Sequence, residues 1–334
     1  MKRGVRVVVV RYRVSVFLMC MLLCTSCAGP TRTADPTERI TAVAEVVNGK
    51  MYVVGGMTLR ESLRSVDVYD PAADTWASAE AMPTDRSMAA SAVLNGCIYV
   101  IGGRKPEGGV LATVEKYDPA ENTWTSCRDM PTPRWGHAAV AASGKIFAFG
   151  GITGVGDNRR TLDVVEVYDP QRDTWTKGPS MPAPRHSPSA AVVNTQVFLI
   201  SGKSVAYPQA GSSPAITDSV HRFDPATGSW TSVAPIPHPR VSSTAVVVDD
   251  LIYVMGGMDR DGGFPTSVDV YDPGTDKWGE GPSLQRGRSG QCGASVGGTA
   301  YLVGGSDVRY GRGQPTLLQG VERVVLKKGV RTPK

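Results

Sequence analysis

Residues 251–257 read Leu-Ile-Tyr-Val-Met-Gly-Gly, and this apolar run closed by two glycines is the centre of a unit spanning residues 240–288. The unit opens and closes on an arginine, holds the turn Asp249–Asp250 before the apolar run, and places Trp278 ten residues before its end. Six arginines open six copies of this unit: Arg39, Arg86, Arg134, Arg185, Arg240 and Arg288. Their spacing of 47 to 55 residues is typical of an array of structural repeats.

Each copy predicts four short strands. The first runs from the arginine to a two-residue turn, the second is the apolar run, the third ends near Tyr-Asp-Pro, and the fourth begins at the tryptophan. Most of the turns use residue types that tolerate the positive φ of a tight hairpin. These turns are Asn48–Gly49, Asn95–Gly96, Ser143–Gly144, Asn194–Thr195, Asp249–Asp250 and Gly297–Gly298.

The recurring pattern resembles the kelch repeat over roughly residues 36–326. It has Gly-Gly after an apolar strand, Tyr seven residues before Trp, and Arg ten residues after Trp; Ser201–Gly202 is the imperfect glycine pair. The resemblance implies an all-β fold, a six-bladed β-propeller with four antiparallel strands per blade. We expect one monomeric propeller over residues 39–326. The sixth copy has no tryptophan, so we expect residues 29–34 or 328–333, the latter within the tail 327–334, to supply its outer strand.

The N-terminus predicts export. Residues 1–26 join a basic segment to an apolar core that is too short to cross a bilayer, which is typical of a signal peptide. Cys27 follows Thr25-Ser26 and resembles a bacterial lipoprotein cleavage site, although Cys24 stands where such sites have leucine. We expect a lipid anchor on Cys27 and a tether over residues 27–38, hence a location in the bacterial cell envelope. The alternative is cleavage after Ala28 and a secreted protein.

Charge and cysteine content exclude several functions. The leader holds five of the 36 lysines and arginines and none of the 31 acids, so the mature chain carries 31 of each. This balance gives no support to nucleic-acid binding. Cys97, Cys127 and Cys292 are predicted to be free thiols, and neither cysteines nor histidines show the spacing of a metal site. We expect no cofactor.

Loop lengths indicate where a partner binds. The loop after each glycine pair varies in length, whereas the other spacings are constant. Because strands alternate in direction, these loops share one end of the ring with the loops that precede each arginine. We call this end the variable face and the opposite end the turn face. The variable loops have an excess of Lys and Arg, and the turns opposite are rich in Asp.

Two groups of residues are candidates for binding on the variable face. The first is the recurring arginines, which either form scaffold hydrogen bonds with the acids of the third strands or bind an anion through guanidinium groups. The second is residues that break the repeat pattern, above all in the third and fourth copies. The candidate binding residues are Arg86, Arg134, Trp135, His137, Arg185, His186, Lys203, Tyr207, Arg240 and Arg288. Glu45, an acid among small residues, has no assigned role.

Enzyme signatures are mostly absent from the sequence: it has no His-Glu-x-x-His, no Gly-x-Ser-x-Gly and no complete phosphate loop. The first hypothesis is therefore a non-catalytic, envelope-anchored module that binds an acidic protein loop or an acidic glycan. The alternative comes from the resemblance, since some exported bacterial kelch proteins are sialic-acid epimerases acting on an acidic sugar. No acid/base pair for that reaction is identified.

Overall fold

The computed structural model describes residues 35–203, 215–308 and 316–326. The predicted signal peptide, Cys27, most of the predicted tether, Tyr207 and both segments expected to complete the last blade lie outside these ranges. The described residues belong to one compact unit. Within the described ranges, no helical segment has the length and apolarity needed to cross a bilayer.

The strands form six sheets in chain order, and the first strand of each is innermost. The first three blades contain β1 (Val43–Val47), β2 (Lys50–Val54), β3 (Val66–Asp70), β4 (Thr75–Ala79); β5 (Ala90–Leu94), β6 (Cys97–Ile101), β7 (Val114–Asp118), β8 (Thr123–Cys127); β9 (Ala138–Ala142), β10 (Lys145–Phe149), β13 (Val165–Asp169), β14 (Thr174–Lys177). The last three contain β15 (Ser189–Val193), β16 (Gln196–Ile200), β17 (Val220–Asp224), β18 (Ser229–Val233); β19 (Thr244–Val248), β20 (Leu251–Met255), β21 (Asp269–Asp272), β22 (Lys277–Glu280); β23 (Cys292–Val296), β24 (Thr299–Val303), β25 (Val321–Val325). The third variable loop adds β11 (Ile152–Thr153), a 3-10 turn (Gly156–Asn158) and β12 (Arg160–Thr161).

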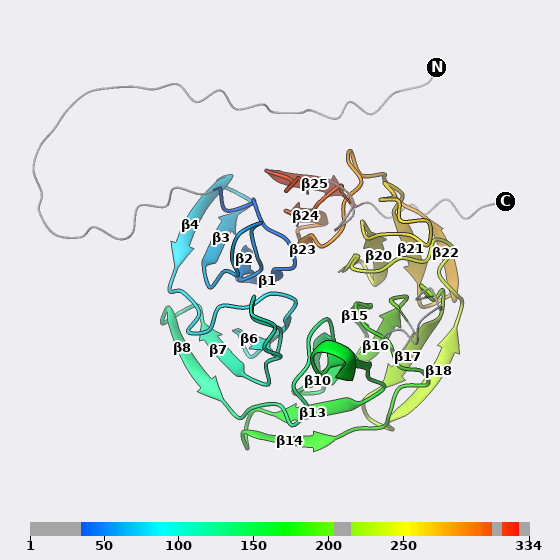
Figure 1. The fold of residues 1–334 in the computed structure, drawn as a ribbon. Helices are drawn as coiled ribbons and strands as arrows, with labels where there is room; N and C mark the ends of the chain where they lie inside the picture. The colour runs from blue at the N-terminus through cyan, green and yellow to red at the C-terminus, as the bar shows by residue number, and fades with distance from the viewer. Residues whose placement is uncertain (1–34, 204–214, 309–315, 327–334) are drawn as a thin grey trace, which may run out of the picture. The chain divides into compact units, whose positions relative to one another are not determined.

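These sheets close into a ring, which confirms the predicted six-bladed propeller (Figure 1). Neighbouring strands within each blade are antiparallel. Each inner strand contacts the inner strand of the next blade, and β23 contacts β1. Five blades have four strands, whereas the described part of the sixth has three. Its outermost described strand, β25, leaves Val325 57% exposed.

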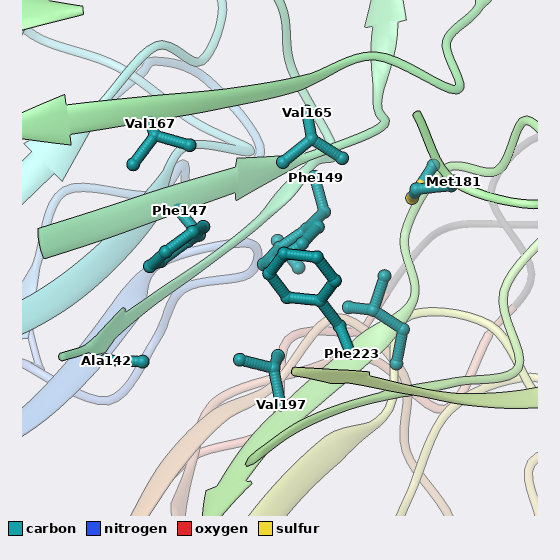
Figure 2. Close-up of a cluster of buried hydrophobic side chains, with 10 residues drawn as sticks. Ala142, Phe147, Phe149, Val165, Val167, Met181, Val197 and Phe223 are labelled. Carbon is teal, nitrogen blue, oxygen red and sulfur yellow. The ribbon is translucent and has the colours of Figure 1, made fainter. Parts of the chain in front are cut away.

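Apolar side chains from adjacent blades pack between the sheets and hold the ring together. Figure 2 shows the cluster between the third and fourth blades, where Phe149 meets Phe223 edge-on at a centroid separation of 5.7 Å. Phe149 is fully buried, and such a ring contributes about 1.5–3 kcal/mol by leaving water. The core therefore lies between blades rather than at the centre of the ring.

Side-chain hydrogen bonds connect neighbouring blades, including the last blade to the first. In three blades a buried Tyr donates to an Asp or Asn five residues on, and that acceptor also takes a backbone N–H from the preceding blade (Asn122, Asp173 and Asp276). In the first blade the corresponding residue is Asp74, and its partner is the side chain of Arg323 on β25. Arg323 also donates to Tyr69 at 2.5 Å. Arg323 thus makes a link that in these other blades comes from the residue directly after a fourth strand.

Candidate functional site

The six recurring arginines are buried, and each guanidinium group is bonded to partners in its own blade. In every copy the Nη1 group donates to the carbonyl of the residue sixteen positions on, which is the first glycine of the pair or its replacement Ser201. In five copies Nη2 contacts an acid on the third strand, for example Glu115 at 2.6 Å from Arg86 and Glu166 at 2.7 Å from Arg134. Arg86, Arg134, Arg185, Arg240 and Arg288 are at most 5% exposed. These bonds match the scaffold alternative.

The second glycine of each pair continues the same pattern. Its N–H donates to the carbonyl of the arginine in the next blade, and the last pair reaches back to Arg39 at 2.9 Å. At Gly257, a Cβ would lie 2.9 Å from the carbonyl oxygen of Val241, and the φ of +88° also disfavours any other residue. The fixed spacing from arginine to glycine therefore corresponds to a hydrogen bond within one blade, and the second glycine adds a backbone hydrogen bond to the next blade.

The fourth blade departs from the pattern and compensates locally. Arg185 has His221 as its partner, at 2.9 Å from Nδ1, in place of an acid. Burial lowers the pKa of Arg185 to about 10, and burial together with the Arg185 charge lowers the pKa of His221 to about 4. Ser201 replaces a glycine, and its hydroxyl donates to Thr217 and accepts the N–H of Arg240. His221 and Ser201 therefore make hydrogen bonds at the positions where the other blades have an acid and a glycine.

At the variable face, a closed ring of backbone hydrogen bonds encircles the axis of the propeller, and we call this ring the collar. It contains one residue from each blade, two positions after the arginine: Thr41, Met88, Gly136, Ser187, Ser242 and Gly290. Each N–H donates to the carbonyl of the preceding blade at 2.6–3.3 Å, and Thr41 completes the circle by donating to Gly290. All six residues have positive φ, including four that are not glycine. The sequence analysis did not identify this ring.

The predicted candidates Trp135, His186 and Lys203 gather on the variable face. Trp135 precedes the collar in the third blade, and its ring lies 6.4 Å from that of His186 in the fourth. His186 pairs by backbone with Lys203, the residue after the glycine pair. Arg104, in the equivalent position of the second blade, places its guanidinium carbon 5.5 Å from the centre of the Trp135 ring. We call Arg104, Trp135, His186 and Lys203 the aromatic–basic cluster.

Burial keeps two of the candidate histidines, His186 and His137, uncharged at physiological pH. Burial, followed by the charge of Lys203, lowers the pKa of His186 to about 4, so its imidazole is neutral at physiological pH. His137 is buried against Gly102 and Gly151 rather than exposed, and burial lowers its pKa to about 3. Trp135 is itself only 9% exposed. Positive charge on the cluster therefore comes from Arg104 and Lys203.

Acids on the variable face offset part of its basic excess. Lys105 lies 4.0 Å from Asp85, Arg260 lies 3.4 Å from Asp218, and Arg286 pairs with Asp307. Asp85 directly precedes Arg86, and Asp218 lies in the variable loop of the fourth blade. Arg104 has no ion pair among those found in the described residues; it stacks on the indole and remains partly exposed.

Arg104 was not among the binding residues predicted from the sequence. The sequence signal for Arg104 was Trp135 in the next blade, because an indole attracts a guanidinium from an adjacent element. The three free thiols agree with the prediction. Among the described residues, no group of three potential metal ligands occurs.

Six blades, buried arginine–acid pairs and a variable loop face define a kelch-type β-propeller. Comparison with known proteins agrees: a model described as "KLHDC2/KLHL20/DRC7 Kelch-repeats domain" matches residues 19–151, 80–257 and 126–305. The chain belongs to this family of Kelch-repeat domains.

Similar proteins include Kelch-like protein 35 of Mus musculus, 32% identical over 240 residues that cover 72% of this chain and 31% of that protein. Beta-scruin of Limulus polyphemus is 30% identical over 123 residues, which cover 36% of this chain and 13% of that protein. The chain spans less than a third of the length of these curated relatives. A solved structure described as "Structure of YjhT" has a TM-score of 0.73 and 18% identity, covering 89% of this chain and 98% of its own, which shows the shared fold.

Proposed function

We propose that this propeller is a non-catalytic binding module, anchored to the cell envelope through Cys27, that binds an acidic partner on its variable face. The kelch fold is consistent with a protein-binding role. An acidic protein loop or an acidic glycan would supply the carboxylates. The proposed anchor rests on the sequence alone.

The observation that carries this proposal is the stacking of Arg104 on Trp135. An indole beneath a guanidinium limits its rotation and leaves the N–H edge available for two parallel hydrogen bonds to a carboxylate. Lys203 lies in the fourth blade, next to the blade of Trp135, and adds a second positive charge. The buried arginines support the site by fixing the blades that carry it.

Calorimetry tests the proposal by measuring the binding of acidic peptides and acidic glycans to the purified protein. Arg104→Gln should weaken binding about tenfold, which corresponds to the loss of one charge-assisted contact. Arg60→Gln is the matched control, because Arg60 is an exposed arginine on a variable loop of the first blade. Added salt should weaken binding of the unmodified protein. Equal losses from both substitutions, or binding insensitive to salt, would contradict the assignment.

The sugar-acid epimerase is a second candidate because His186 is a neutral, partly exposed imidazole beside this cluster. A neutral imidazole can accept a proton, although a pKa of about 4 makes it a weak base at neutral pH. Binding is therefore the first proposal. Faster exchange between the anomers of an acidic sugar in an NMR spectrum, lost in His186→Gln, would favour the enzyme.

A further inference from the structure

The inner strands surround an axial channel whose wall consists of small and apolar residues. A cavity of about 370 Å³ lies within it and is lined by residues of all six blades. The lining is alanine, valine, serine and glycine with one exception, Glu45 in the middle of β1. The equivalent positions of the other blades hold Ala92, Val140, Ala191, Val246 and Ala294. The channel therefore has one carboxyl group on an otherwise uncharged wall.

The carboxyl group of Glu45 is held in place but lacks a positively charged neighbour in the wall. Ser91 on β5 donates its hydroxyl to Oε1 at 2.7 Å. On β2, the residue opposite in register is Tyr52, a phenol that is neutral at physiological pH because burial raises its pKa. On its other side, β1 packs against β23, which supplies Ala294 and Ser295. Among the lining residues, all within the described ranges, there is no lysine, arginine or histidine.

These surroundings favour either a bound proton or a bound cation. A carboxylate facing an apolar wall without a counter-charge is costly, and burial raises the pKa of Glu45 to about 7. One carboxylate and one hydroxyl are too few ligands for a divalent metal, which takes six or more oxygens. An ammonium group needs fewer acceptors and carries its own hydrocarbon, which suits the alanine and valine wall.

The two ends of the channel differ in what they admit. At the variable face the collar encircles the axis. Its hydrogen-bonded neighbours are about 5 Å apart, and because six points form a hexagon, each Cα atom lies only about 5 Å from the centre of the opening. At the turn face the inner strands end in two-residue turns, and one of these is the acidic pair Asp249–Asp250. A small cation would therefore enter from the turn face, where negative charge raises its local concentration.

We propose that the axial channel binds a primary alkylammonium ion, with its N–H groups on Glu45 and Ser91 and its hydrocarbon chain against the alanine and valine wall. This site is separate from the aromatic–basic cluster and takes a ligand of opposite charge. The proposal does not depend on the binding of an acidic partner.

Titration of the full-length protein with n-butylammonium chloride, followed by ligand-observed NMR, tests the proposal. Binding should be detectable at millimolar ligand at pH 8. A carboxyl group with a pKa of about 7 is about 90% ionised at pH 8 and about 3% at pH 5.5, so affinity should fall about thirtyfold between them. Tetramethylammonium, which has the charge but no N–H donor, should bind at least tenfold more weakly.

Two substitutions with a control separate this site from general charge effects. Glu45→Gln keeps the shape and should weaken binding more than tenfold at pH 8, whereas Glu61→Gln, on a variable loop, should leave it unchanged. Ala139→Leu narrows the channel from β9 without touching Glu45 and should also reduce binding. Each folded variant is checked by circular dichroism. Absence of binding to the unmodified protein at pH 8, or equal binding to Glu45→Gln, would overturn the proposal.

Discussion

Replacing His221 with glutamate should stabilise the protein, because the fourth blade then gains the buried ion pair that five other blades have. In register, His221 lies opposite Leu199 as Glu115 lies opposite Val100, so the new carboxyl group would point toward Arg185. The present contact is a hydrogen bond of 2.9 Å to a neutral imidazole, compared with 2.6 Å between Arg86 and Glu115. Exchanging a neutral acceptor for a charged one contributes about 1–2 kcal/mol.

Acid should enlarge this difference. The pKa of His221 falls from 6.5 to about 4 on folding, so the unfolded chain binds more protons between these pH values and stability is lost as pH falls through them. The shift corresponds to at most about 3 kcal/mol. The variant lacks this histidine, and its advantage should therefore grow from about 1–2 kcal/mol at pH 7 to at most about 4 kcal/mol near pH 4.

Thermal and urea unfolding at pH 7 and pH 4.5 measure both effects. At pH 7 the melting temperature should rise by roughly 2–5 °C. The matched reverse change, Glu115→His in the second blade, should lower stability by a similar or larger amount. The reasoning is refuted if His221→Glu melts below the unmodified protein at pH 7, or if its advantage shrinks on acidification.

Three further changes test the scaffold, the anchor and the closure of the ring. Arg134→Ala leaves Glu166 buried without its partner and should lower the free energy of unfolding by about 3–5 kcal/mol; a loss below 1 kcal/mol in urea unfolding would contradict a structural role. Cys27→Ala should move the protein from the detergent phase to the aqueous phase in a partitioning assay, and recovery of the unmodified protein in the aqueous phase, cleaved after Ala28, would end the lipoprotein hypothesis. Deletion of residues 328–334 should lower the melting temperature if the tail covers the edge of β25, and an unchanged value would point to residues 29–34 or to an open edge.

The repeat frame was predictable because its constant spacings correspond to hydrogen bonds within and between blades. Sixteen residues separate each arginine from the residue whose carbonyl it binds, and this constant separation can be counted directly in the sequence. The free thiols followed from strand geometry for the same reason, since Cys97 and Cys127 occupy strands two apart within one blade.

The contact between Arg104 and Trp135 and the collar could not be predicted in this way. A repeat shows which positions are equivalent, but the stacking of Arg104 on Trp135 depends on side chains of adjacent blades meeting across a gap that no spacing records. In the collar, Thr41, Met88, Ser187 and Ser242 adopt positive φ, which these residue types disfavour, so their identities give no indication of it. The surrounding blades impose the conformation.

The collar has an electrical consequence for the mouth of the channel. Its six peptide dipoles point around the circle in one rotational sense, so their vector sum is close to zero. A helix terminus, by contrast, adds its dipoles along one axis and presents unbonded N–H groups to an anion. Here every collar N–H is already bonded to the preceding blade. The peptide backbone at this rim therefore attracts neither anions nor cations preferentially. Side chains such as Arg104 determine whether acidic or basic ligands are favoured.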